Sequence, residues 1–214
     1  MIIDERMAAF INSFDKGNTV FLDELEKYAR ETDVPIIRKQ MQGLLKFLLA
    51  FLKPASILEV GTAIGFSAIL MSEYGPKDCR ITTIEKYEKR IPLARENFKK
   101  AGMEDRITLL EGDATDILKE LKEPYDMIFM DAAKGQYLNF LPWIMEVLTC
   151  GGVLVTDNIL HEGDILESRY GVTRRDRTIH GRMREYLQAL KNMPELDTIC
   201  LPLGDGLTIS TKMC

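Results

Sequence analysis

The chain has 214 residues, of which 46% are apolar and 29% charged, as is typical of one soluble α/β domain with a full core. Its net charge of −5 argues weakly against a nucleic-acid partner. No stretch approaches the roughly 18 apolar residues of a membrane helix, and the opening MIIDERMAAF carries two acids too early for a signal peptide. We therefore expect a cytoplasmic protein with no membrane contact.

The cysteines are expected to be reduced thiols without a function. Cys79, Cys150, Cys200 and Cys214 lie far apart, no two of them have CxxC spacing, and only two histidines accompany them. These counts and spacings argue against a zinc site and favour a reducing compartment.

The first 53 residues predict a helical cover. Helical patterns follow one another in DERMAAFINSF (4–14), LDELEKYARET (22–32) and IRKQMQGLLKFLLAFLK (37–53). The third has apolar residues at helical spacing and is stopped by Pro54.

From residue 56 to residue 158, short β-type runs alternate with helical segments, which indicates βαβ units around a parallel sheet. The runs are apolar at consecutive positions, as expected when helices cover both faces. The stretch LDTICLPLGDGLTISTK (196–212) then predicts an antiparallel hairpin at the sheet edge. The prediction is one α/β domain, residues 1–214, with a helical cover at 1–53 and a doubly wound core at 54–214.

A glycine turn follows the first predicted strand, in EVGTAIGFS. Such a turn lets a ligand approach the backbone near the N-terminus of a helix. A dinucleotide fingerprint would need three glycines where the chain has Gly61, Ala63 and Phe66, so a pyrophosphate site is not expected. The next strand ends in Glu85, where a carboxylate can accept from both hydroxyls of a ribose.

Acidic residues recur at or near the ends of the predicted strands, at Glu59, Glu85, Asp113, Asp131 and Asp157. Each of them alone is explained by a loop or a helix cap. Because open α/β sheets bind ligands at the carboxyl ends of their strands, the five together predict a binding site at that edge.

The stretches ILEVGTAIGFSA, ITTIE, GDA, YDMIFMDAAKGQY and GGVLVTDN resemble the metal-dependent class I S-adenosylmethionine O-methyltransferases of the catechol and caffeoyl-CoA type, from about residue 34 to the end. The resemblance implies a Rossmann-like doubly wound sheet of order 3-2-1-4-5-7-6, with the last strand antiparallel, and a homodimer. It also implies S-adenosylmethionine as cofactor, held by Ile37, Glu59, Gly61, Ser67, Glu85, Asp113, Ala114 and Asp131.

Two neighbouring strands of that sheet would bring Asp131, Asp157 and Asn158 together. Two carboxylates and an amide are hard oxygen donors that suit Mg²⁺ (or Mn²⁺), and the resemblance assigns the same three residues as metal ligands. Asp131 and Lys134 are the predicted catalytic residues. An ammonium near a divalent cation is disfavoured by like charge, so Lys134 can act as a base. The alternative for Lys134 is a solvated loop lysine.

A basic segment follows, with six arginines and one acid between Arg169 and Arg184. Guanidinium groups suit phosphates and stack on bases, and RRDRTIHGRM resembles the bacterial branch that methylates 5-hydroxyuridine at the tRNA wobble position. This predicts a tRNA anticodon loop as partner, contacted by Arg169, Arg174, Arg175, Arg177 and Arg182. The alternatives are a solvated helix start, a methyltransferase of small catechol or caffeoyl-CoA-like substrates, and a non-catalytic nucleotide-binding module.

Overall fold

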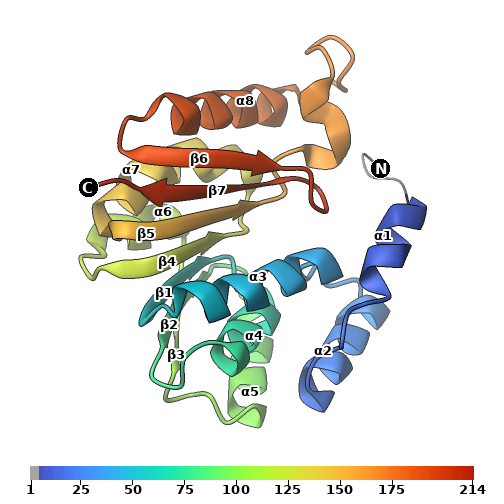
Figure 1. The fold of residues 1–214 in the computed structure, drawn as a ribbon, viewed down its shortest axis with the longest axis vertical. Coiled ribbons are helices and arrows are strands. Elements are labelled where there is room, and N and C mark those ends of the chain that lie inside the picture. The colour runs from blue at the N-terminus through green and yellow to red at the C-terminus, as the bar shows by residue number, and fades with distance from the viewer. Residues whose placement is uncertain (1–4) are drawn as a thin grey trace.

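A seven-stranded sheet forms the centre of the computed structural model, which describes residues 5–214 (Figure 1). Its order is β3-β2-β1-β4-β5-β7-β6, and β7 alone runs antiparallel to the others, which confirms the predicted topology. The strands are β1 (Ser56–Val60), β2 (Arg80–Glu85), β3 (Ile107–Glu111), β4 (Tyr125–Met130), β5 (Leu148–Asp157), β6 (Leu196–Leu201) and β7 (Leu207–Lys212).

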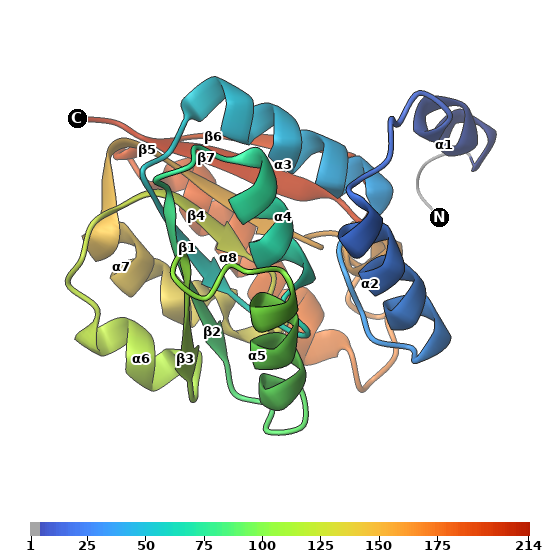
Figure 2. The same cartoon turned by 90° about the horizontal axis from the view of Figure 1, so that it is seen from below.

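Helices cover both faces of this sheet (Figures 1 and 2). One layer contains α2 (Val20–Glu31), α3 (Lys39–Leu52), α4 (Phe66–Tyr74) and α5 (Ile91–Lys100). The other contains α6 (Ala114–Glu120), α7 (Tyr137–Val147) and α8 (Arg177–Asn192). Two short 3-10 helices, η1 (Lys134–Gln136) and η2 (His161–Leu166), follow β4 and β5 at the edge where those strands end.

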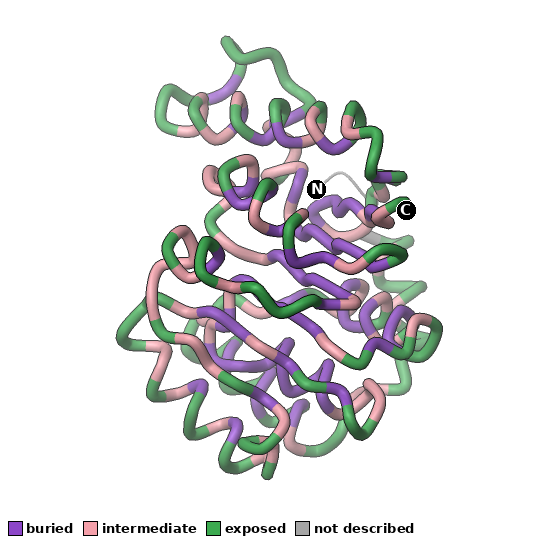
Figure 3. The backbone as a smooth tube through the Cα atoms, turned by 90° about the vertical axis from the view of Figure 1, so that its left-hand side faces the viewer, coloured by how far each residue is buried: buried purple, intermediate pink, exposed green. Residues whose placement is uncertain are grey.

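The two hydrophobic cores explain why the strands have continuous apolar runs. Successive side chains of a strand point to opposite faces, so Ile57 of β1 packs under the first helical layer and Leu58 under the second. Both are fully buried. Figure 3 shows buried residues along the strands and on the helix faces turned toward them. A sheet covered on both sides leaves only its strand ends accessible to ligands.

The expectation that all cysteines are reduced is wrong for one pair, since Cys150 and Cys214 form a disulfide. Antiparallel pairing of β5 with β7 sets Val153 opposite Thr211, and the same register brings the two cysteines within 5.4 Å between Cα atoms. The two cysteines are 64 residues apart, so the sequence alone does not indicate that they are close in space. Cys79 and Cys200 are free thiols.

Helix α1 (Glu5–Asn12) stands apart from the sheet and its two helical layers (Figure 2). This helix confirms residues 5–12 of the helix predicted at 4–14, and Asp4 lies outside the described residues. Between residues 5 and 214 the structure has no helix that is both long enough and apolar enough to cross a membrane.

Candidate active site

A cavity of about 330 Å³ opens at the carboxyl ends of β1, β2 and β4. Seven of the eight residues predicted to hold the cofactor line it: Ile37, Gly61, Ser67, Glu85, Asp113, Ala114 and Asp131. Their convergence follows from the parallel sheet, which delivers the ends of consecutive strands to one edge.

Gly61 allows the loops after β1 and β4 to touch. Its φ of 108° lies in the region that favours glycine, and a Cβ at this position would come within 2.1 Å of the backbone oxygen of Asp131. Any other residue would push the two strand ends apart, so this glycine sets the floor of the cavity.

Glu85 is held at the cavity wall by backbone donors. The N–H groups of Ala63, Lys86 and Tyr87 donate to its two carboxylate oxygens at 2.8, 3.0 and 2.8 Å. A carboxylate offers about four acceptor positions, so one remains for a ligand hydroxyl, one fewer than the predicted contact with both ribose hydroxyls needs. The arrangement fixes an anion where the sequence predicts a ribose.

Asp113 lines the cavity and also caps α6, which was the alternative explanation for each strand-end acid. Its side chain accepts from the N–H of Thr115 at 2.8 Å and pairs with Lys86 at 3.1 Å. The bond from Thr115 is the main reason why the pKa of Asp113 falls to about 2. The carboxyl is therefore ionised at any physiological pH.

Glu59 does not line the cavity, unlike the other predicted cofactor residues. It is fully buried, its Oε2 accepts from the hydroxyl of Thr83, and its Oε1 has no hydrogen-bond partner among the described residues. Burial raises the pKa of Glu59 to about 7. Its predicted contact with the cofactor stays a prediction, because Glu59 is not among the residues that line the cavity.

The three predicted metal ligands meet at a second cavity of about 200 Å³, which shares Asp131 with the first. The side-chain amide of Asn158 donates to Asp131 at 2.8 Å, and the backbone N–H of Asn158 donates to Asp157 at 2.7 Å. Burial and the charge of Asp131 raise the pKa of Asp157 to about 7, and burial raises the pKa of Asp131. Two buried carboxylates that repel each other form a place where a cation would relieve the repulsion.

The donor set at this point has two carboxylates and one amide oxygen. Within residues 5–214, no group of three or more His, Cys, Asp or Glu residues could hold a metal ion. Hard oxygen donors in this small number fit Mg²⁺, which keeps several waters and takes few protein ligands.

Lys134 reaches into the same region from η1. Its Nζ lies 3.3 Å from Asp205 Oδ2 and 3.2 Å from His161 Nδ1, and its side chain is 22% exposed. A solvated loop lysine would not be held in this way. Neither partner is apparent in the sequence, because GDG predicts only a turn and no motif marks His161.

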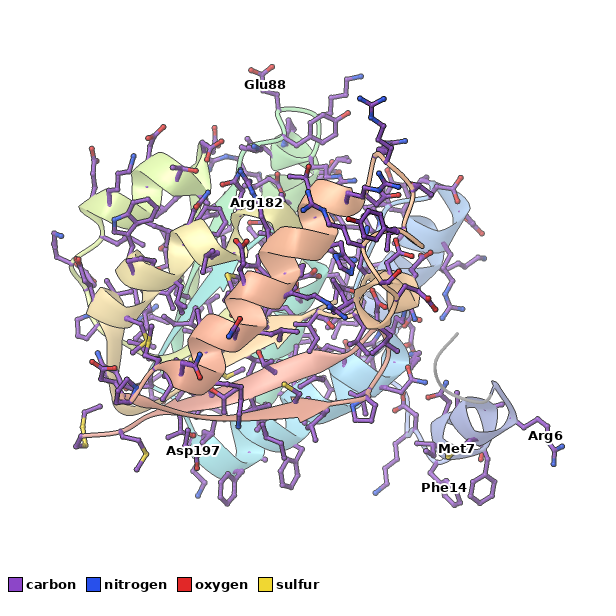
Figure 4. All side chains as sticks on the ribbon, turned by 90° about the horizontal axis from the view of Figure 1, so that it is seen from above. Arg6, Met7, Phe14, Glu88, Arg182 and Asp197 are labelled. Atoms are coloured by element: carbon purple, nitrogen blue, oxygen red, sulfur yellow. A yellow bond between two sulfur atoms is a disulfide. The ribbon has the colours of Figure 1, made fainter. Side chains whose placement is uncertain are left out.

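The basic segment divides into two groups. Arg182 and Arg184 donate to the backbone oxygens of Gly135 and Ile165 at 2.8 and 3.0 Å and so fasten the segment to η1 and η2, whereas Arg177 donates to Val172 within the segment at 3.2 Å. Figure 4 shows Arg182 on α8. The structure describes this whole segment, and in it three exposed arginines have no side-chain hydrogen bond or ion pair: Arg169, Arg174 and Arg175.

One wall of the second cavity is apolar. Ile36, Met41 and Leu203 line it, facing a polar edge that includes Arg38 and Asp205.

Comparison with known proteins gives a consistent result. A family model described as O-methyltransferase matches residues 12–213. The chain is 32% identical to a catechol O-methyltransferase of Mycobacterium tuberculosis, over 74% of this chain and 73% of that one. It is 37% identical to a catechol O-methyltransferase of Niastella koreensis over 59% of each, so it spans less than two thirds of that relative.

Solved structures agree with these matches. A Staphylococcus aureus protein provisionally named a caffeoyl-CoA O-methyltransferase superposes with a TM-score of 0.90 at 30% identity, over 98% of this chain and all of that one. The methyltransferase PaMTH1 of Podospora anserina, solved with S-adenosylhomocysteine bound, has a TM-score of 0.87 at 28% identity, over 98% and 95% of the two chains.

Proposed function

Because the chain belongs to the S-adenosylmethionine-dependent O-methyltransferase family, we propose that it methylates the 5-oxygen of 5-hydroxyuridine at the wobble position of tRNA. The cofactor cavity, the acidic second cavity and Lys134 account for methyl transfer to an oxygen. The choice of tRNA rests on one observation, the three unpartnered arginines of the basic segment.

S-adenosylmethionine supplies an electrophilic methyl group when it is bound. The structure supports its place in the larger cavity, where three backbone N–H groups hold Glu85 at the position proposed to contact a ribose. Asp113 lines the same cavity, and its carboxyl group is ionised. Gly61 lets the backbone of Asp131 lie against the turn after β1, which brings the two strand ends together at the cavity.

The proposal includes Mg²⁺ (or Mn²⁺), held by Asp131, Asp157 and Asn158. A bound divalent cation favours ionisation of a hydroxyl that coordinates it, which methyl transfer to oxygen requires. The repulsion between the two buried carboxylates supports this assignment. Lys134 then acts as the base that removes the hydroxyl proton.

The acceptor must present two neighbouring oxygens, and 5-hydroxyuridine does so with its O4 and 5-hydroxyl. An anticodon loop is single-stranded, so such a base can be presented at small unstacking cost. The exposed guanidinium groups of Arg169, Arg174 and Arg175 suit the adjoining phosphates. A tRNA substrate also implies action in the cytoplasm.

A second candidate is a small catechol or caffeoyl-CoA-like acceptor. The names of the relatives and the apolar wall of Ile36, Met41 and Leu203 favour it. A non-catalytic nucleotide-binding module would need neither Lys134 nor the paired carboxylates, so it is disfavoured.

A homodimer is the third part of the proposal. Two pairs of exposed aromatic rings contact each other within the pair: Phe10 (65% exposed) of α1 with Phe14 (69%) just after it, and Phe47 (63%) with Phe51 (72%) on α3. Residues of α1, of the loop after it and of the first half of α3 line one surface pocket, and Figure 4 shows Phe14 beside α1. A second copy would cover this apolar face.

Light scattering should give the mass of a dimer. Replacement of Phe47 and Phe51 by serine should reduce that mass to the mass of a monomer.

The substrate is tested by offering both acceptors to one preparation. Purified protein with S-adenosylmethionine and Mg²⁺ should methylate tRNA that bears 5-hydroxyuridine and leave matched tRNA bearing uridine unchanged. Efficient turnover of 3,4-dihydroxybenzoate, with the hydroxyuridine tRNA ignored, would establish the small-molecule candidate instead.

A further inference from the structure

We propose that His161 is a proton relay for Lys134, carrying the proton of the acceptor hydroxyl from the base to solvent. This inference rests on the proposed function, because it concerns the same reaction. It assigns a role to a residue that neither the sequence motifs nor the predicted metal and cofactor sites include.

The Nζ of Lys134 has two side-chain partners, Asp205 Oδ2 at 3.3 Å and His161 Nδ1 at 3.2 Å. The Asp205 carboxylate is buried and stabilises the ammonium once a proton has arrived. Lys134 must lose that proton before the next turnover, and Nδ1 of His161 lies within hydrogen-bond distance of its Nζ.

The other nitrogen of His161 points toward acidic side chains and solvent. Its Nε2 lies 4.0 Å from both Asp164 and Asp176, and the side chain is 21% exposed. An imidazole can accept a proton at one nitrogen and release one from the other. The ring therefore joins Lys134 to a partly exposed, acidic edge formed by η2 and the segment before α8.

The backbone that carries the ring is held in an uncommon conformation. His161 and Glu162 both have positive φ, at 49° and 57°, a region that residues other than glycine rarely adopt. The turn between β6 and β7 holds them there. Asp205 Oδ1 accepts from the N–H of Glu162 at 2.6 Å, and the Asp205 backbone oxygen accepts from the N–H of Leu160 at 2.9 Å. One residue thus fixes both the lysine and the loop that carries the histidine, as a strained site requires.

The proton balance of the relay is simple. For each methyl group gained, the acceptor hydroxyl loses one proton, which forms a new N–H bond on neutral Lys134. The ammonium gives a proton to Nδ1 of His161, and the resulting imidazolium releases the Nε2 proton to water. Exchange with water then returns the remaining proton from Nδ1 to Nε2. The lysine and the imidazole are both restored, and no reactant other than water is needed.

The relay requires one tautomer, and this can be measured without turnover. Nitrogen-15 NMR of the metal-free, cofactor-free protein at pH 8 should show Nδ1 of His161 unprotonated and Nε2 carrying hydrogen. Assignment is direct because the chain has two histidines, and His161→Gln removes one signal set. A His161 ring protonated at Nδ1 would overturn the relay.

Kinetics provide the second readout. His161→Ala should lower kcat by up to about 10²-fold, the lower end for a general acid–base group, with KM for both substrates and cofactor affinity kept. Added imidazole should restore much of the rate, which a purely structural role would not allow. A wild-type kcat, or a loss confined to KM and unaffected by imidazole, would refute the relay. If the wild-type protein methylates no acceptor, the proposed function fails and the NMR measurement alone decides the Lys134–His161 contact.

Discussion

The two cavities that meet at Asp131 are built in different ways. The first, the cofactor cavity, is lined mainly by residues at the ends of parallel strands, such as Gly61, Glu85 and Asp113. The second, which we assign to the acceptor, combines the end of β5 with the β6–β7 turn, which are distant in the sequence, and with the segment before α3, whose residues 35–37 also line the first. The cofactor side is therefore determined by the fold, whereas the acceptor side depends on loops that can change with the substrate.

Removal of divalent metal should lower turnover more than any other change. It should act on the acceptor side only and leave cofactor binding intact. Excess chelator should abolish turnover, and added Mg²⁺ or Mn²⁺ should restore it. Calorimetry should show that S-adenosylhomocysteine still binds to the chelated protein. Full activity in excess chelator would remove the metal from the mechanism.

Loss of the base should come next. Lys134→Ala should lower kcat by about 10²–10⁴-fold, the usual cost of a missing general base. Lys134→Arg keeps the positive charge near Asp205 but cannot act as a base at neutral pH, so it should be similarly slow. Cofactor affinity should not change in either variant. A wild-type rate for Lys134→Ala would leave this lysine with a structural role only.

The cofactor side could largely be predicted from the sequence, and the reason is physical. A parallel sheet places the ends of its strands at one edge, so the residues that follow each apolar run are neighbours in space. Glu59 shows the limit of this reasoning. It comes two residues before the turn, within β1, and its buried side chain does not line the cavity.

The acceptor side could be predicted only in part. Asp131, Asp157 and Asn158 lie at strand ends and are predictable for that reason, whereas Asp205 comes from a turn 71 residues away from Lys134. The six arginines look alike in the sequence, and only their hydrogen bonds separate those that fasten the segment from those that are free. Strand register, which the sequence does not specify, likewise decides the pairing of the cysteines.

Glu85→Ala should weaken cofactor binding and leave the acceptor side unchanged. The loss should be about 1.5–3 kcal/mol of binding free energy, the range for hydrogen bonds to charged groups. Glu88→Ala is the matched control, since this exposed acid lies three residues further along the same loop (Figure 4). Calorimetry with S-adenosylhomocysteine measures both variants. Unchanged affinity of Glu85→Ala for S-adenosylhomocysteine would contradict the assignment of Glu85 to the ribose.

Charge reversal on the basic segment should have the smallest effect, and that effect should be confined to the affinity for RNA. Glutamate at Arg174 and Arg175 should weaken tRNA binding and flatten its log–log dependence on salt by about 0.7 for each phosphate that is no longer neutralised. Arg177 is left unchanged because it bonds to Val172. Glutamate at Lys77 and Lys99, near the amino ends of the strands, makes the same change in charge as a control. Equal salt slopes in both double variants would contradict a specific RNA surface.

Mass spectrometry of tRNA nucleosides from cells with and without this protein decides the tRNA assignment. We predict that 5-methoxyuridine disappears and 5-hydroxyuridine accumulates when the protein is absent. The wild-type chain should restore the modification, while Lys134→Ala should not. An unchanged level of 5-methoxyuridine in cells that lack the protein would contradict the assignment and leave the small-molecule acceptor as the substrate.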